Sequence, residues 1–337
     1  MRTGGALAAA GLIDRAGVAA ADAVARNYAV AITPHVAGLI ERGAADDPIA
    51  RQYLPDPGEL ARSPGERDDP IGDDAHSPLP GVVHRYPDRV LLMPTTACPV
   101  YCRFCFRRER VGHGAAAMSA EQLDAALAYV ASRPAIREVI LTGGDPMILS
   151  PRRLGGILGR AAAIANVEVL RVHSRVPVAD PARIDRALIA ALGQDVPVYV
   201  AIHCNHPREI DPAAARAIAA LADAGVPLLA QTVLLRGVND DADTLAALFR
   251  ALVRHRVRPY YLHHPDLAPG TARFRLSVAE DQALVRALRG RISGLCQPTY
   301  VLDIPGGYGK VPVGPSFRDA GGGLSDWQGA AHPDPHG

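Results

Sequence analysis

The sequence predicts an α/β fold in which a parallel sheet is covered by helices. Two observations carry this prediction. Apolar, strand-like runs alternate with amphipathic helical patterns, and the last five runs are spaced by about thirty residues; the runs are at 89–93, 138–141, 167–172, 196–202, 226–233 and 257–262. That spacing is typical of strand–helix units, and such units bury a parallel sheet under helices. Six strands are fewer than the eight of a closed barrel.

The first part of the chain is expected to be helical. Residues 1–54 are rich in Ala, and a first helix is predicted to run through Leu12, Val18 and Val24. A second pattern covers residues 28–40, where Pro34 either interrupts the helix or starts a new segment. Seven prolines and many Asp residues then fall between 55 and 87. They predict an extended arm on the surface and no packed element.

Two of the helices between the strands have clear signatures. Ser119-x-x-Gln122 is a capping box, and it precedes a face formed by Leu123, Leu127 and Val130. A similar face recurs at Leu245, Leu248 and Leu252. Residues 299–304 are predicted to add one more strand, and the tail from residue 315, rich in Gly, Pro and Asp, is expected to be flexible.

Composition narrows the class of partner. The chain has 337 residues, 48% hydrophobic content, and 36 basic against 35 acidic residues. It can bury a sizeable core, but its charge favours neither nucleic acid nor an anionic membrane, so a small ligand is expected. No apolar run approaches the roughly 20 residues of a membrane span. Five cysteines, three of them crowded together, suit a reducing compartment and predict a cytoplasmic protein.

Three cysteines are the most distinctive feature. Cys98, Cys102 and Cys105 have the spacing C-x3-C-x2-C. A cubane iron–sulfur cluster is usually held by four thiolates, so three leave one iron open to a small molecule. A zinc site or simple buried cysteines are the alternatives, but structural zinc favours paired C-x2-C units and no second pair exists.

This spacing resembles the signature of the radical S-adenosylmethionine (SAM) superfamily. The resemblance implies a [4Fe–4S] cluster, bound SAM and a partial (β/α)6 TIM-like barrel. Because the cysteines follow the first strand, they are expected at the C-terminal ends of the strands, where sites gather in such barrels.

Polar residues follow the next strands. Gly143, Gly144 and Asp145 end the second strand, and glycines there allow a ligand to approach the backbone. Alone they indicate only a turn; beside the cysteine loop they resemble the SAM-contacting GGE/GGD motif of the superfamily. Ser174 and Arg175 end the third strand and His203 the fourth. These three are candidate SAM contacts, although polar capping of a strand explains His203 equally well.

Lys310 is the only lysine in the chain and lies in the Gly-rich stretch 306–312. An amine forms a Schiff base and a guanidinium does not, so a single lysine among arginines favours pyridoxal phosphate (PLP). A phosphate cradle is a poorer interpretation because the Walker pattern is missing. An ordinary surface lysine is the other alternative.

Seven stretches of the chain together resemble the lysine 2,3-aminomutase family, and the resemblance extends over about residues 50 to 314. The stretches are 86–93, 98–108, 143–145, 205–207, 233–240, 258–261 and 305–310. The resemblance implies that Lys310 forms a Schiff base with PLP. It also implies that Arg85, Tyr86 and Arg89 hold the cofactor's phosphate and ring region, and Arg suits phosphate because it makes paired charge-assisted hydrogen bonds.

The resemblance and simple charge matching indicate L-lysine as the substrate. Arg107 matches the family position that binds the substrate carboxylate. Asp266 and Asp303 match the two acids that bind the ε-ammonium, where a glutamate-specific relative would need basic or neutral groups. A single Asp in a loop is more often a cap or turn residue, but two at matching positions favour lysine.

The implied activity is a PLP-assisted 1,2-amino migration that converts L-lysine to β-lysine, with an external one-electron reductant such as flavodoxin or ferredoxin. Longer family members carry a zinc-binding, cysteine-rich C-terminal extension. No cysteine follows Cys296 here, so no structural zinc is expected. Family members form dimers or larger assemblies, and without the extension the sequence does not decide whether this chain forms a homo-oligomer.

Three alternatives stay open: the aminomutase branch that makes (R)-β-lysine for elongation factor P, a radical SAM enzyme without PLP, and a cluster-bearing redox sensor. The expected division of the chain is a helical extension with a Pro-rich arm (1–85), the radical SAM barrel (86–298), and a PLP-lysine segment with its tail (299–337).

Overall fold

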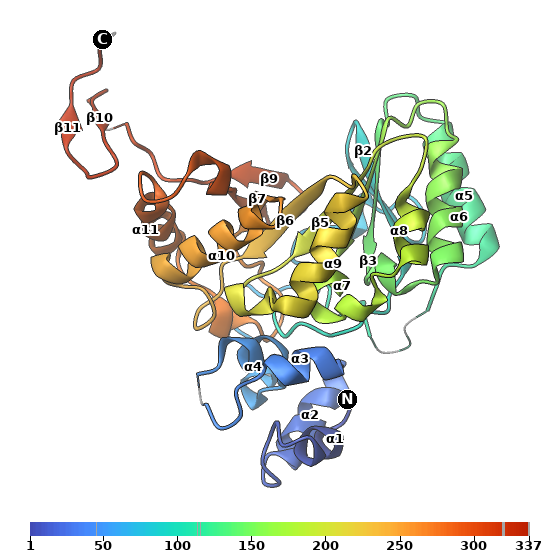
Figure 1. Cartoon of the computed structure of the whole chain (residues 1–337), viewed down its shortest axis with the longest axis horizontal. Coiled ribbons are helices and arrows are strands. Elements are labelled where there is room, and N and C mark those ends of the chain that lie inside the picture. Colours follow the sequence, from blue (N-terminus) through green and yellow to red (C-terminus); the bar gives the residue numbers. More distant parts are fainter. Residues whose placement is uncertain (45, 113, 115, 319–320, 336–337) are drawn as a thin grey trace.

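A computed structural model describes residues 1–44, 46–112, 114, 116–318 and 321–335. One sheet of nine strands dominates the fold, and its strands follow one another in chain order (Figure 1). Strands β2 to β8 run parallel, while β1 and β9 pair antiparallel at the two edges. The strands are β1 (Val82–Tyr86), β2 (Arg89–Thr95), β3 (Glu138–Gly143), β4 (Val169–Ser174), β5 (Val198–His203), β6 (Leu228–Val233), β7 (Val257–His263), β8 (Thr299–Ile304) and β9 (Gly309–Pro312).

Helices connect the parallel strands and cover the outside of the sheet (Figure 1). They are α5 (Ala120–Ala131), α6 (Pro151–Ala162), α7 (Val176–Ala179), α8 (Arg186–Leu192), α9 (Pro212–Asp223), α10 (Ala242–Arg254) and α11 (Val278–Leu288). All six predicted strands and the added one at 299–304 are confirmed. Because the sheet starts at β1 and ends at β9, the barrel is partial and open, as predicted.

The predicted helix signatures are confirmed. The Ser119 hydroxyl accepts a hydrogen bond from the Gln122 amide, and the Gln122 side chain accepts one from the Ser119 amide. Leu127 is buried in the main core, where Leu245 also lies. The apolar face of each helix therefore packs against the apolar strands, which is the main source of stability in such a fold.

The N-terminal extension is helical but divided differently from the prediction. Its helices are α1 (Gly4–Ala9), α2 (Val18–Asn27), α3 (Pro34–Leu39) and α4 (Pro48–Tyr53). The single helix predicted through Leu12 is wrong, because the chain turns at Gly11 with φ of 67°, a conformation that suits glycine. Pro34 starts a new helix, and Thr33 caps it.

Figure 1 shows α1 to α4 gathered at one end of the barrel. Backbone hydrogen bonds attach them to the cysteine loop: the Tyr101 amide donates to Ala31 and the Arg103 amide to Gln52. The extension therefore covers the end of the barrel that carries the cysteines.

The Pro-rich arm was predicted wrongly in two respects. Its last part is the edge strand β1, in which Val82 and Val83 are buried and pair with β2. The preceding residues are not a surface wrap, because Glu59, Glu66 and Asp73 are all buried. Single-turn 3-10 helices punctuate this arm and later loops; they are η1 (Pro57–Leu60), η2 (Asp74–His76), η3 (Pro146–Ile148), η4 (Pro181–Arg183), η5 (Pro207–Glu209), η6 (Ala272–Phe274) and η7 (Gly294–Cys296).

The tail contains a small antiparallel pair, β10 (Leu324–Ser325) and β11 (Ala331–His332), which was not predicted. Across the described residues, no helix combines the length and apolar character needed to cross a bilayer.

Candidate functional site

The three clustered cysteines lie on the loop that follows β2, at the C-terminal ends of the parallel strands. Each is only partly exposed and none is in a disulfide. Cys98 and Cys105 pack with Ala31, Tyr101 and Val111 in a small apolar cluster. Around these two cysteines, the thiols are therefore the groups that can bind a metal.

The donor set fits a multi-iron cluster. Burial raises the pKa of Cys105 to about 11 and also raises those of Cys98 and Cys102. Such thiols ionise when a metal binds them. In the described residues, no group of three or more His, Cys, Asp or Glu side chains is arranged to hold a single metal ion. Thiols that each bind a different iron of a cubane need not converge on one point, so this finding is compatible with a cluster.

Arg175 lies directly beside one of these thiols. Its Nη1 donates to Cys102 Sγ at 3.2 Å, and its Nη2 donates to both Gln52 and Glu209 at 2.7 Å. The guanidinium is buried and holds together the extension, the cysteine loop and the strand ends. Its side-chain partners in the protein are a thiol, an amide and an acid.

The structure explains why glycines occupy the Gly143-Gly144-Asp145 turn, which the sequence did not show. A Cβ on Gly144 would lie 2.1 Å from the Ala97 carbonyl oxygen, and one on Gly143 would lie 2.6 Å from Met93. The glycines therefore allow the end of β3 to press against the cysteine loop. Asp145 is buried and accepts hydrogen bonds from Ser174 Oγ (2.8 Å) and the Arg175 amide (2.7 Å). The motif thus connects β3 to β4 below the cysteines.

Three histidines line the same end of the barrel. His203 ends β5, and burial together with Arg175 and Arg107 lowers its pKa to about 4. Burial likewise lowers the pKa of His173, whose ring centroid is 5.9 Å from that of His203, and of His263, which also faces Lys310. All three rings are therefore neutral near pH 7. The Nε2 atoms of His173 and His263 are buried and have no hydrogen-bond partner among the residues that the structure describes, as expected beside a bound ligand.

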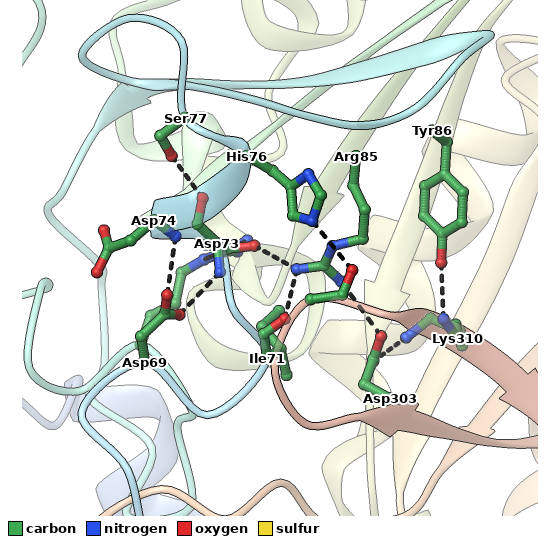
Figure 2. A network of polar contacts seen from close by, with 12 residues as sticks. Asp69, Ile71, Asp73, Asp74, His76, Ser77, Arg85, Tyr86, Asp303 and Lys310 are labelled. Atoms are coloured by element: carbon green, nitrogen blue, oxygen red, sulfur yellow. Dashed lines mark hydrogen bonds and ion pairs between the residues drawn. The ribbon is translucent and has the colours of Figure 1, made fainter.

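Lys310 lies in β9 and faces the barrel interior. Its Nζ forms an ion pair with Asp303 of β8, and its amide donates to the Tyr86 hydroxyl at 2.7 Å (Figure 2). Arg89 stacks 3.9 Å above the centre of the Tyr86 ring. The structure therefore brings the predicted PLP lysine together with Tyr86 and Arg89.

A chain of charged contacts continues from Lys310 to the cysteine loop. Asp303 lies 3.6 Å from Arg85, and Arg85 pairs with Asp73 at 3.0 Å. Asp73 also pairs with Arg107 at 2.9 Å, and Arg107 follows Cys105 by two residues. Lys310 is thus at the same end of the barrel as the cysteines, as the sequence hypothesis requires.

Asp266 follows β7 and completes the charged group. Burial and the neighbouring carboxylate of Asp303 raise its pKa to about 7, although Lys310 and Arg107 act in the opposite direction. Asp266 therefore lies within electrostatic range of Asp303, Asp73, Lys310 and Arg107. A ligand with a carboxylate and an ammonium group would match their charges.

The residues around Lys310 also fit a phosphorylated cofactor. Within the described part of the chain, Arg85 Nε is buried without a hydrogen-bond partner, and its Nη1 lies 3.6 Å from Asp303. Unsatisfied guanidinium donors suit phosphate. The donor chemistry therefore agrees with the predicted set of Lys310, Arg85, Tyr86 and Arg89.

Several residues of the site were missed from the sequence. Asp73, Gln52 and Glu209 contact the arginines of the site, yet Asp73 lies in a stretch interpreted as a surface arm. The run Asp-Asp-Pro-Ile-Gly-Asp-Asp at 68–74 was the available signal, because such a dense group of acids can match buried arginines. Gln52 and Glu209 gave no signal.

The chain is similar in sequence to the radical SAM superfamily and to several L-lysine 2,3-aminomutases. Residues 92–249 match the Radical SAM superfamily. The L-lysine 2,3-aminomutase of Acetoanaerobium sticklandii is 44% identical over 288 residues, covering 86% of this chain and 70% of that protein. The enzyme of the same name from Clostridium subterminale is 43% identical over 292 residues, covering 87% and 70%. A radical SAM methyltransferase from Sphaerobacter thermophilus, solved by crystallography, is 20% identical with a TM-score of 0.47, covering 66% and 68%.

Proposed function

The chain belongs to the lysine 2,3-aminomutase family of radical SAM proteins, and from that premise we propose that it converts L-lysine to β-lysine by moving the α-amino group to Cβ. The observation that carries the proposal is the charged chain from Lys310 through Asp303, Arg85 and Asp73 to Arg107. It joins the only lysine to the loop of the three thiols.

The family implies a [4Fe–4S] cluster, SAM and PLP. We assign the cluster to Cys98, Cys102 and Cys105, SAM to the strand ends at Gly143, Gly144, Asp145, Ser174, Arg175 and His203, and PLP to Lys310, Arg85, Tyr86 and Arg89. When bound, these groups supply one-electron chemistry at the substrate carbon and a carrier for the migrating nitrogen.

The side chains of the protein bind and orient the substrate in this proposal. Arg107 takes the substrate carboxylate, because a guanidinium matches that group. Asp266 and Asp303 take the ε-ammonium. Asp303 is paired with Lys310 in the structure, so binding of the substrate ε-ammonium would require Asp303 to share or exchange this partner. Holding both ends of lysine fixes Cβ, and small errors in position are costly in such reactions.

Further parts of the proposal concern the setting of the enzyme. We propose a cytoplasmic protein that receives electrons from a flavodoxin or ferredoxin; self-association as a homo-oligomer is a further part of the proposal. The proposed division is an extension and arm (1–85), a barrel (86–298) and a lysine segment (299–337), with β1 of the arm and β8 and β9 of the lysine segment completing the sheet of the barrel.

Anaerobic reconstitution with iron, sulfide, PLP, SAM, a reductant and L-lysine tests the proposal. The expected result is β-lysine formation that stops when PLP or SAM is omitted. Lysine conversion that does not need PLP would contradict it in favour of a radical SAM enzyme without PLP, and a protein that loads its cluster but converts no lysine would favour a redox sensor. Formation of (R)-β-lysine in this assay would favour the branch that supplies elongation factor P.

A further inference from the structure

A carboxylate from the Pro-rich arm connects the two arginines of the site. Asp73 Oδ1 accepts a hydrogen bond from Arg85 Nη2 at 3.0 Å. Its Oδ2 accepts two from Arg107, from Nε at 3.1 Å and from Nη2 at 2.9 Å. The Asp73 side chain is only 3% exposed. One buried acid therefore pairs with and orients two guanidiniums, that of Arg85 in β1 (Figure 2) and that of Arg107 in the cysteine loop.

The contacts with Asp73 leave specific donors free on each arginine. Arg107 uses its Nε and Nη2 for Asp73, while its Nη1 makes a long contact of 3.4 Å with Thr142. Arg85 uses Nη2 for Asp73 and for the Ile71 carbonyl (2.7 Å), while its Nε is buried and has no partner among the described side chains and backbone groups. Each guanidinium is thus held on one side and keeps donors on another.

The arm itself is anchored so that Asp73 cannot easily move. Asp69 accepts hydrogen bonds from the amides of Asp73 (2.9 Å) and Asp74 (2.8 Å). Gly72, with φ of 72°, lies so close to the lysine turn that a Cβ would be 2.4 Å from the Gly307 amide nitrogen. His76 contacts the Gly307 carbonyl at 3.0 Å. The segment from Asp69 to His76 is therefore fixed against the turn that carries Lys310.

We propose that Asp73 is a positioning residue that aims Arg85 at the cofactor phosphate and Arg107 at the substrate carboxylate. The inference rests on the proposed function and adds a residue to it. Asp73 touches neither ligand; it acts by fixing the two guanidiniums, so that their free donors face the site before any ligand binds. Preorganised donors of this kind increase affinity because less freedom is lost on binding.

Asp73→Asn tests this role because it removes the charge with little change in shape. Anaerobically reconstituted protein is titrated with PLP and, separately, with pyridoxal, which lacks the phosphate. We expect the preference for PLP over pyridoxal to fall about tenfold or more, and the KM for lysine to rise about tenfold with the KM for SAM unchanged. Asp73→Glu, which retains the charge, is expected to recover part of both losses.

Asp74→Asn is the matched control, because Asp74 is adjacent and pairs with Arg110 at the surface (2.7 Å, 73% exposed). It is expected to leave both quantities unchanged. A folded Asp73→Asn protein whose affinities for PLP and pyridoxal fall equally would show a general structural role and overturn the inference. If Asp73→Asn does not fold, Asp73→Glu replaces it; the preference is then expected to fall about threefold, and an unchanged preference overturns the inference. A wild-type protein that neither binds PLP nor converts lysine would instead refute the proposed function.

Discussion

The hydroxyl of Tyr86 accepts a hydrogen bond of 2.7 Å from the backbone amide of Lys310, 224 residues later. Tyr86 ends β1 and Lys310 lies in β9, so this bond connects the two edge strands of the open sheet. The gap in the barrel is thus bridged at the residue on which the proposed chemistry depends.

Tyr86→Phe should weaken this bridge without removing the ring under Arg89. A neutral hydrogen bond contributes about 1 kcal/mol, so we expect urea unfolding to show a loss of that size. PLP is expected to bind several-fold more weakly because the Lys310 backbone loses its restraint. Unchanged stability and unchanged PLP affinity would together contradict the role of this bond.

The chain offers an internal control for the cluster assignment. Replacing Cys98, Cys102 or Cys105 by Ala should abolish the visible absorbance and the iron content of the reconstituted protein. Cys204 and Cys296 are buried elsewhere in the main core, so Cys204→Ala and Cys296→Ala should retain both. A cluster that survives loss of one of the three, or that needs Cys204, would show that the ligand set is wrong.

Lysine binding should depend on pH through Asp266. Its pKa is raised to about 7, and only the ionised carboxylate attracts the ε-ammonium. The kcat/KM for lysine is therefore expected to fall as the pH drops below 7, approaching tenfold per pH unit at the acidic limit. Asp266→Asn should lower kcat/KM and remove this dependence; a profile of the same shape in the variant would assign the titration to another group.

The same shift has a consequence for stability. The folded-state pKa of Asp266 lies above the usual value of 3.8, so the proton that it binds stabilises the fold at low pH. That contribution is complete below about pH 4 and is lost as the pH rises through about 7. Urea unfolding should therefore show a smaller loss of stability between pH 5 and 8 for Asp266→Asn than for the wild type.

Glu59 should be the most sensitive acid of the arm. It is fully buried and pairs with Arg103 (2.6 Å) and Arg108. Burial pushes its pKa up, yet the two guanidiniums hold it below the ordinary value. Glu59→Gln is expected to destabilise the fold by about 3–5 kcal/mol, because it leaves buried charge uncompensated. Glu168→Gln breaks an exposed pair with Arg137 and should change urea stability by less than about 1 kcal/mol.

The barrel was predictable from the sequence because its signals are local. Parallel strands are buried on both faces and appear as short apolar runs, and the Ser119 capping box lies within four residues. The role of Asp73 was not predictable, since its partners Arg85 and Arg107 are 12 and 34 residues away and become neighbours only in the folded chain.

Two other features of the structure, strand β1 and the contacts of the glycines at the end of β3, were also not predicted from the sequence. The strand β1 was hidden because prolines at 78, 80 and 87 surround a run of only five residues. Gly143, the last residue of β3, and Gly144 were interpreted as allowing a ligand to approach the backbone, and their close contacts with Met93 and Ala97 also require glycine. The sequence indicates that the backbone at these glycines lies close to another group, but it does not show whether that group is a ligand or another part of the chain.

The most direct test of the account compares Lys310→Ala and Lys310→Arg with the wild type. Arg preserves a positive charge beside Asp303 but cannot form the covalent link to PLP. After anaerobic reconstitution, both variants should lose the absorbance of protein-bound PLP and all β-lysine formation while the iron–sulfur spectrum remains. Retention of PLP absorbance and of lysine conversion in either variant would contradict the central claim that this single amine holds the second cofactor beside the cluster.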